Sequence, residues 1–199
     1  MQHSIPSIPF SRHLSALRPV LGRTATVAAA AASLTLAACA PMSAMYSQDS
    51  LPDAVKVPAG NKVVLQTVGA GEILYECRPK KDMPGQFEWT FVGPDAVLKD
   101  RSGMQVGRYY GPPATWESSD GSKVTATQAA VAPAGTGNIP YQLVKANPAT
   151  GMGAMTQTTY IQRVATRGGV APAEACDMSK AGAKQKVGYQ ADYIFWKAN

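Results

Sequence analysis

Short apolar runs separated by turn residues make up most of this chain after about residue 57. The clearest alternation covers residues 86–92, where Phe87, Trp89 and Phe91 share one face and polar residues occupy the other. A period of two is typical of a half-buried strand. The last apolar run, residues 187–195, has the same period. Its apolar face consists of Val187, Tyr189, Ala191, Tyr193 and Phe195.

The turn residues between these runs predict hairpins. Asp120-Gly121 separates the runs 115–118 and 123–131, and a dipeptide of this type between two apolar runs is a strong hairpin signal. Two Gly-x-Gly sequences, Gly69-Ala70-Gly71 and Gly151-Met152-Gly153, lack the third glycine and the following helix of a dinucleotide-binding loop, so we interpret both as turns.

No window of ten or more residues shows the apolar stripe of an amphipathic helix, and only residues 172–178 are expected to form one short helix, with Pro172 near its start. We therefore predict an all-β fold. It is a single sandwich- or barrel-like antiparallel domain of about 8–10 short strands, preceded by a disordered N-terminal signal segment and a tether.

The N-terminal region has the features of an export signal. Arg12, Arg18 and Arg23 precede an uncharged, Ala-rich stretch that ends in Leu36-Ala37-Ala38-Cys39. This order is typical of a signal peptide, and its end is similar to the box at which lipoprotein signals are cleaved. An ordinary cleaved signal peptide is the alternative. The predicted organisation is a signal peptide at 1–38, a flexible tether at 39–56 and a β-rich domain at 57–199.

Lipid attachment at Cys39 would make the membrane a partner through an N-terminal anchor, because several acyl chains hold a protein stably at a bilayer. An aspartate directly after the acylated cysteine retains lipoproteins in the inner membrane. Ala40 stands at that position in this chain, so this retention is not expected. We expect an outer-membrane lipoprotein that faces the periplasm or the exterior. The alternative is a soluble periplasmic or secreted protein.

Charge gives little reason to expect a nucleic-acid partner. The precursor has a net charge of +6, but removal of the signal leaves sixteen basic and thirteen acidic residues, a net charge of +3. The remaining basic residues are scattered and do not alternate with aromatic residues as they do in nucleic-acid-binding grooves.

Both histidines, His3 and His13, lie in the predicted signal peptide. Their removal excludes imidazole-based nucleophile activation and metal sites built on histidine. No cofactor or metal is expected, and the chain is more readily interpreted as a binding or structural protein than as an enzyme. The alternative is a carboxylate-dependent hydrolase or lyase that acts on polysaccharide.

With Cys39 acylated, Cys77 and Cys176 form an even pair in an oxidising compartment, which predicts one disulfide. Two unpaired buried thiols are the alternative.

The best local candidate for a ligand surface lies around residues 109–120. Aromatic faces stack on sugars and carboxylates accept their hydrogen bonds, so a glycan or another small polar ligand would suit it. The alternative is structural, with the tryptophan in the core and the acids in a turn and on a solvated strand. The residues of this possible ligand surface are Tyr109, Tyr110, Trp116, Glu117 and Asp120.

Residues 57–197 resemble an uncharacterised secreted family, domain of unknown function 3455 (DUF3455), found in bacteria and fungi. A histidine often precedes the Gly-Pro pair in that family, whereas Arg108-Tyr109-Tyr110 stands there in this chain. The resemblance implies export and a common fold but no activity. It is carried by Leu74–Cys77, Trp89, Ala96–Asp100, Gly107, Gly111-Pro112, Trp116, Asp120–Val124, Arg163–Gly169, Ala171-Pro172, Cys176 and Ala191–Tyr193.

Overall fold

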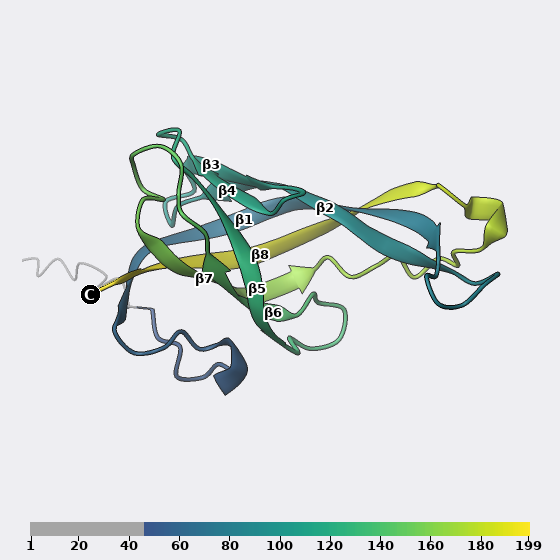
Figure 1. The fold of residues 1–199 in the computed structure, drawn as a ribbon, viewed down its shortest axis with the longest axis horizontal. Coiled ribbons are helices and arrows are strands. Elements are labelled where there is room, and N and C mark those ends of the chain that lie inside the picture. Colours follow the sequence, from purple (N-terminus) through teal and green to yellow (C-terminus); the bar gives the residue numbers. More distant parts are fainter. Residues whose placement is uncertain (1–45) are drawn as a thin grey trace, which may run out of the picture. The chain divides into compact units, whose positions relative to one another are not determined.

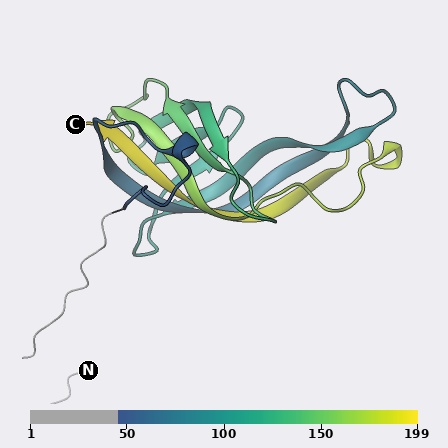
Figure 2. The ribbon, with the colours of Figure 1, turned by 90° about the horizontal axis from the view of Figure 1, so that it is seen from below.

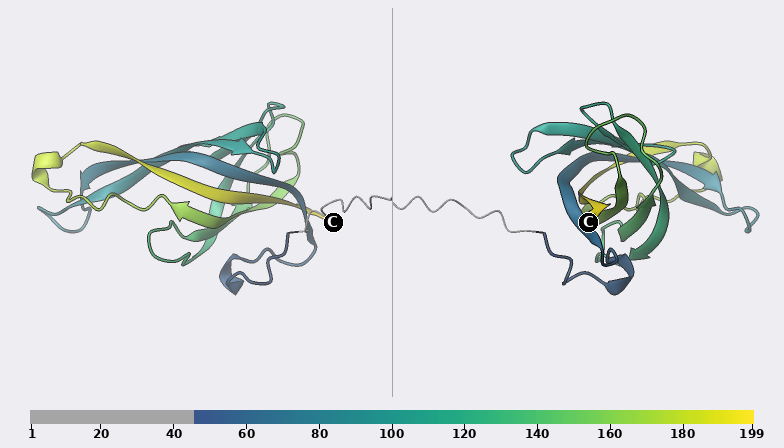
Figure 3. Two further views of the ribbon diagram at one scale, coloured as in Figure 1. Left: turned by 180° about the vertical axis from the view of Figure 1, so that it is seen from behind. Right: turned by 60° about the vertical axis from the view of Figure 1, so that its left-hand side comes forward.

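The computed structural model describes residues 46–199, which form eight antiparallel strands and two single turns of 3-10 helix. Each strand pairs with the next in sequence, and the last pairs with the first, so the sheet closes into a barrel (Figure 1, and almost end-on in the right panel of Figure 3). The predicted all-β antiparallel fold is confirmed, as a barrel. Its elements are η1 (Asp53–Val55), β1 (Asn61–Pro79), β2 (Phe87–Lys99), β3 (Gln105–Tyr110), β4 (Thr115–Ser118), β5 (Lys123–Ala132), β6 (Tyr141–Ala146), β7 (Thr158–Gly168), η2 (Met178–Lys180) and β8 (Lys184–Ala198).

The prediction of a turn at Gly69-Ala70-Gly71 was wrong, because β1 runs through it without a break. A Cβ atom on Gly69 would lie 2.5 Å from the Tyr193 ring, and one on Gly71 would lie 2.2 Å from the carbonyl oxygen of Asp95. The two glycines therefore let neighbouring groups approach the strand closely, which is a known role of glycine inside strands.

Three strands continue beyond the barrel. β3 ends opposite Asp95 of β2, and β7 ends opposite Tyr189 of β8, so the rest of β2 and β8 pairs only with β1. This three-stranded extension, which we call the arm (residues 72–79, 87–94 and 184–188), leaves the barrel on one side (Figure 2). The predicted disulfide is present in the arm, where Cys77 is bonded to Cys176.

The prediction of a short helix at 172–178 was also wrong. Only Met178–Lys180 forms a single 3-10 turn, and the residues before it are irregular. The carbonyl of Glu174 accepts a hydrogen bond from Trp89 Nε1 at 2.8 Å, and Cys176 is held by the disulfide. Contacts with the arm thus replace the internal hydrogen bonds that a helix would make.

The inward-facing side chains fill most of the barrel. The face predicted for the last run is confirmed, because four of its members belong to the interior core and the fifth, Val187, is partly buried against it. The largest of them, Tyr193 and Phe195, are fully buried beside Trp116 and Leu98.

A second core lies on the outer face of the barrel, under residues 46–57. Val55 and Val57 are buried there against Val164, Ile194 and Trp196, among others. Fully buried Gln162 binds this segment, since its Nε2 donates to the carbonyl of Val55 at 2.7 Å. Residues 46–56, predicted to belong to a flexible tether, are instead packed on the barrel, because their apolar side chains cover this surface.

The predicted signal peptide, Cys39 and the first part of the tether lie outside the described residues. Within residues 46–199, no helix is long and apolar enough to cross a membrane.

Candidate functional site

Four of the five residues predicted to form a ligand surface are divided between the two faces of the sheet, and the fifth, Asp120, lies in the turn between β4 and β5. Tyr109 and Trp116 point inward and are 5% and 1% exposed, and their rings stack with centroids 4.6 Å apart. Tyr110 and Glu117 lie next to them in sequence, on the opposite, outer face. The structure does not bring the five side chains together.

The outer pair makes a local polar cluster. The Tyr110 hydroxyl donates to Glu117 Oε2 at 2.9 Å, and Lys123 Nζ lies 3.1 Å from Glu117 Oε1. The hydrogen bond from Tyr110, followed by that from Lys123, lowers the pKa of Glu117. Each oxygen of the carboxylate thus has a partner on the same outer surface.

Asp120 organises a turn. Its carboxylate accepts hydrogen bonds from the Ser122 hydroxyl at 2.6 Å and the Ser122 N–H at 2.9 Å, and from the Ala154 N–H at 2.7 Å. These bonds, led by that from the Ser122 hydroxyl, lower the pKa of Asp120 to about 2. The residue ties the β4–β5 hairpin to the loop before β7, which is the structural role considered above.

A cavity of about 190 Å³, which we call the mouth cavity, lies at the end of the barrel next to the arm. Tyr109 and Trp116 contribute to its lining, so two of the predicted residues belong to a site of a different kind from the one expected. Arg163, Gln128 and Gln142 are its polar residues. Its other walls are Phe91, Pro94, Gly111, Pro112, Ala114, Ala126 and Val144.

Several donors at the mouth cavity have no acceptor. The indole N–H of Trp116 is buried and has no hydrogen-bond partner among the described residues. The other two tryptophans are satisfied, since Trp89 donates to Glu174 and Trp196 donates to Gln162. Within residues 46–199, the Tyr109 hydroxyl also makes no hydrogen bond, and unlike Trp116 Nε1 it is not completely buried, although the residue is only 5% exposed. The lining therefore includes two residues, Trp116 and Tyr109, whose hydrogen-bonding groups the chain itself leaves unused.

Arg163 is the only charged residue among the described residues that line the mouth cavity. Its Nε and Nη2 donate to the carbonyl of Pro140 at 3.3 and 3.1 Å, and no carboxylate of the described region lies within 4.0 Å of it. Beside it, Gln142 Nε2 donates to Gln128 Oε1 at 2.7 Å. A guanidinium without a carboxylate is thus available at the cavity.

Buried tyrosines surround this arginine. Tyr189 and Tyr193 share a hydrogen bond of 3.2 Å between their hydroxyls, and Tyr75 donates to the carbonyl of Gly169 at 2.7 Å. Burial raises the pKa of these phenols and that of Tyr109, while the positive charge of Arg163 acts in the opposite direction on all four. The phenols are neutral at physiological pH, so they do not neutralise the guanidinium.

Sequence reasoning missed the polar part of this lining, although the signal was present. Arg163 follows the interior Ile161 by two positions, Gln128 follows Ala126, and Gln142 precedes Val144. A period of two places all three polar residues on inward-facing positions of their strands. A charged residue in that position is uncommon in a strand whose inner face fills a core.

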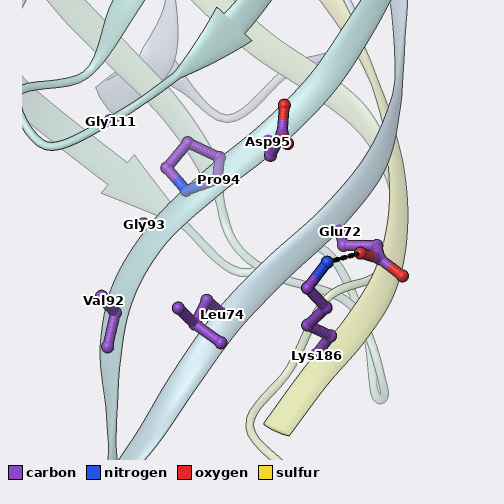
Figure 4. A pocket seen from close by; sticks show the side chains of 8 residues that line it. All are labelled: Glu72, Leu74, Val92, Gly93, Pro94, Asp95, Gly111 and Lys186. Carbon is purple, nitrogen blue, oxygen red and sulfur yellow. Dashed lines mark hydrogen bonds and ion pairs between the residues drawn. The ribbon is translucent and has the colours of Figure 1, made fainter. Parts of the chain in front are cut away.

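A second groove lies on the arm, where Glu72, Asp95 and Lys186 contribute its charged side chains (Figure 4). Lys186 Nζ lies 2.8 Å from Glu72, and Arg108 Nη2 lies 3.1 Å from Asp95. Each acid is therefore ion-paired and exposed. Among residues 46–199, no cluster of three or more His, Cys, Asp or Glu side chains could hold a metal ion.

The comparisons with known proteins agree with the resemblance noted in the sequence. A family model described as "Protein of unknown function (DUF3455)" matches residues 58–197. No curated protein and no solved structure matches the chain.

Proposed function

This chain belongs to the DUF3455 family of proteins of unknown function, and we propose that it is a lipid-anchored protein of the cell envelope that binds a small molecule in the mouth cavity. On this proposal the barrel holds its ligand without transforming it. The anchor is Cys39, and the outer membrane is its expected location.

The unpartnered indole N–H of Trp116 is the observation that carries the binding proposal. Buried polar groups in proteins are almost always hydrogen-bonded, and leaving one without a partner costs about 1–3 kcal/mol. The Trp116 ring contributes to the lining of the mouth cavity, although its Nε1 atom is itself buried, so a small shift of the ring would let an acceptor held in the cavity remove that cost. Small-molecule sites typically combine such convergent polar groups with apolar walls.

The same lining favours binding over catalysis. It contains no Asp, Glu, His, Ser, Cys or Lys, so it offers neither a carboxylate for acid–base chemistry nor a usual nucleophile. The carboxylate-dependent hydrolase or lyase would need two acids that converge across a cleft. Glu72 and Asp95 share the arm groove, but each is engaged by a cation, so no observation favours that alternative.

Binding can be measured at the indole itself. In the mature protein purified in detergent and labelled with ¹⁵N at tryptophan, the three indole N–H groups give three NMR signals, which Trp89→Phe and Trp196→Phe assign by elimination. The probes are single-ring compounds at millimolar concentration: phenol, cyclohexanol, benzamide and glucose. We expect at least one to shift the Trp116 signal saturably and to leave the other two in place.

The matched control is Ala126→Leu, which fills the cavity at a wall position. It should abolish the shift while the thermal midpoint and circular dichroism stay near those of the parent. If no probe moves the Trp116 signal, or if Ala126→Leu responds as the parent does, only water reaches the indole and the binding proposal is wrong.

The anchor is tested separately by cell fractionation. Cys39→Ser should move the protein from the membrane to the soluble fraction, whereas Ser43→Ala, a change in the same segment, should leave it with the membrane. Membrane retention of Cys39→Ser would contradict acylation at this position without affecting the binding proposal.

A further inference from the structure

Resting on the proposed function, we infer that the mouth cavity selects a small organic carboxylate with an apolar body about the size of one ring, which it holds through Arg163. The inference concerns the chemical class of the ligand. It follows from three properties of the cavity: the type of its unused hydrogen-bonding groups, its charge and its size.

The unused groups are mainly donors. Arg163 keeps N–H groups beyond those directed at Pro140, the Tyr109 hydroxyl can donate, and the buried Trp116 Nε1, in the ring stacked on Tyr109, can only donate. A ligand that satisfies them must be rich in acceptors. An ionised carboxylate offers two oxygens with about four acceptor positions, whereas an alcohol or an amide offers fewer.

The charge of the cavity points the same way. Within the described region, Arg101, Arg163 and Arg167 have no carboxylate partner, and of these three only Arg163 is partly buried. Guanidinium and carboxylate groups match each other in planar, two-bond geometry, and such charge-assisted bonds are roughly twice as strong as neutral ones. An anionic ligand would therefore complete the site electrostatically as well as sterically.

Size and wall composition define the rest of the ligand. The cavity measures about 190 Å³, and an apolar cavity of about 150 Å³ is known to hold one benzene molecule. The rest of the lining is largely apolar, with Phe91, Pro112 and Val144 among its residues. One ring with a carboxylate fits this volume, and a disaccharide does not.

The test compares benzoate with benzamide, which has the same ring and nearly the same size but no charge. Dissociation constants come from the Trp116 indole signal of the mature protein in detergent, at 50 and 500 mM NaCl. We expect benzoate to bind at least tenfold more tightly than benzamide at low salt, and the higher salt concentration to weaken benzoate binding alone.

Arg163→Gln should weaken benzoate binding at least tenfold and leave benzamide binding unchanged. Arg167→Gln removes the same charge from an exposed position of the same strand, outside the cavity lining, and should have no effect on either probe. Arg163→Lys keeps the charge but loses the planar fork, so it should retain part of the preference for benzoate. This variant keeps the test conclusive if Arg163→Gln does not fold.

The outcomes separate the two proposals. If benzamide binds as tightly as benzoate, or if benzoate binding survives Arg163→Gln and ignores salt, the carboxylate inference is wrong while binding in the cavity stands. If neither compound shifts the Trp116 signal, the carboxylate inference is wrong. If none of the other single-ring probes shifts it either, the binding proposal is wrong too. If inorganic phosphate displaces benzoate at equal concentration, the site recognises small anions in general and the inferred ligand class is wrong.

Discussion

At the scale of single residues, glycine positions determine how closely neighbouring groups pack in this barrel. Gly69 lies on the inner face of β1, and the Tyr193 ring occupies the space where its Cβ would be. Tyr193 in turn contacts Tyr109 and Trp116, with ring centroids 5.0 and 5.9 Å away. One glycine therefore sets the position of the aromatic group beneath the mouth cavity.

Gly69→Ala should destabilise the fold by about 1–3 kcal/mol, because an added methyl group in a filled core forces its neighbours off their preferred positions. Gly188→Ala is the control, since a Cβ at that position meets no atom within 4 Å and should change stability by less than about 0.5 kcal/mol. Urea denaturation measures both. Equal stability of the two variants would show that the ring can move away at no cost.

Asp120 gives a prediction for pH dependence. Its pKa is lowered from 3.8 to about 2 in the folded protein. Because the folded-state pKa is the lower one, the carboxylate stabilises the fold above about pH 4, and this contribution is lost as the pH falls through about 2.

Asp120→Asn should therefore lower the thermal midpoint at pH 6, and the difference from the parent should shrink between pH 4 and pH 2. Asp82→Asn is the control, since Asp82 is exposed and makes no hydrogen bond or ion pair within residues 46–199, and it should track the parent at every pH. A constant difference between Asp120→Asn and the parent down to pH 2 would contradict this role of the charge.

At the scale of elements, the arm depends on a covalent bond. Its strands pair only with one another, without the closed ring that protects the barrel, and Trp89 donates a hydrogen bond to Glu174 in the segment before η2. Cys77 is completely buried at this place, and its disulfide with Cys176 closes a loop of 99 residues. The bond therefore fastens an irregular segment to a narrow sheet.

Removing the bond by the double change Cys77→Ser and Cys176→Ser should cost about 2–5 kcal/mol, as is typical of native disulfides in exported domains. Hydrogen exchange should locate the effect, with faster exchange at residues 72–79 and little change at residues 96–98 inside the barrel. Uniform acceleration across both ranges would show instead that arm and barrel unfold as one unit.

Local sequence pattern predicted these elements well where side chains alternate and turns are short. The run 115–118 coincides with β4, and the run 123–131 covers all of β5 except its last residue. It failed at Gly69-Ala70-Gly71, since glycine favours both turns and close packing inside a strand, and only the position of Tyr193 decides between them.

The candidate site was less predictable because it depends on which strands become neighbours. Trp116 and Tyr109 were identified, but with Glu117 and Asp120 as companions, which are close in sequence and lie elsewhere on the sheet. Their real companion in the cavity, Arg163, belongs to β7, and barrel closure alone brings it there.

At the scale of the whole molecule, the sheet is buried on both sides over part of its surface. The interior core fills the barrel, and residues 46–57 cover a second core outside it. The family model starts only at residue 58, yet Val55 is completely buried. The covering segment is therefore part of the folded unit in this chain.

Val55→Ala should destabilise the protein by about 2 kcal/mol, since it removes two methyl groups from a buried site. The neighbouring Lys56→Ala removes only a surface ion pair with Asp53, whose side chain is 95% exposed, so it should change stability by less than about 1 kcal/mol. Denaturant unfolding compares the two. Equal effects would mean that the segment covers the outer core without stabilising it.

Closure of the ring by β1 and β8 has a consequence for the order of events during folding. The pairing runs from Asn61 opposite Ala198 to Glu76 opposite Lys184. β1, which is synthesised first, therefore cannot complete its pairing until β8 is present. Until then it presents an open edge, which is a template for joining another chain. A premature stop codon before residue 184 would thus produce an open sheet whose unpaired edge strand can pair with other chains, rather than a slightly shorter barrel.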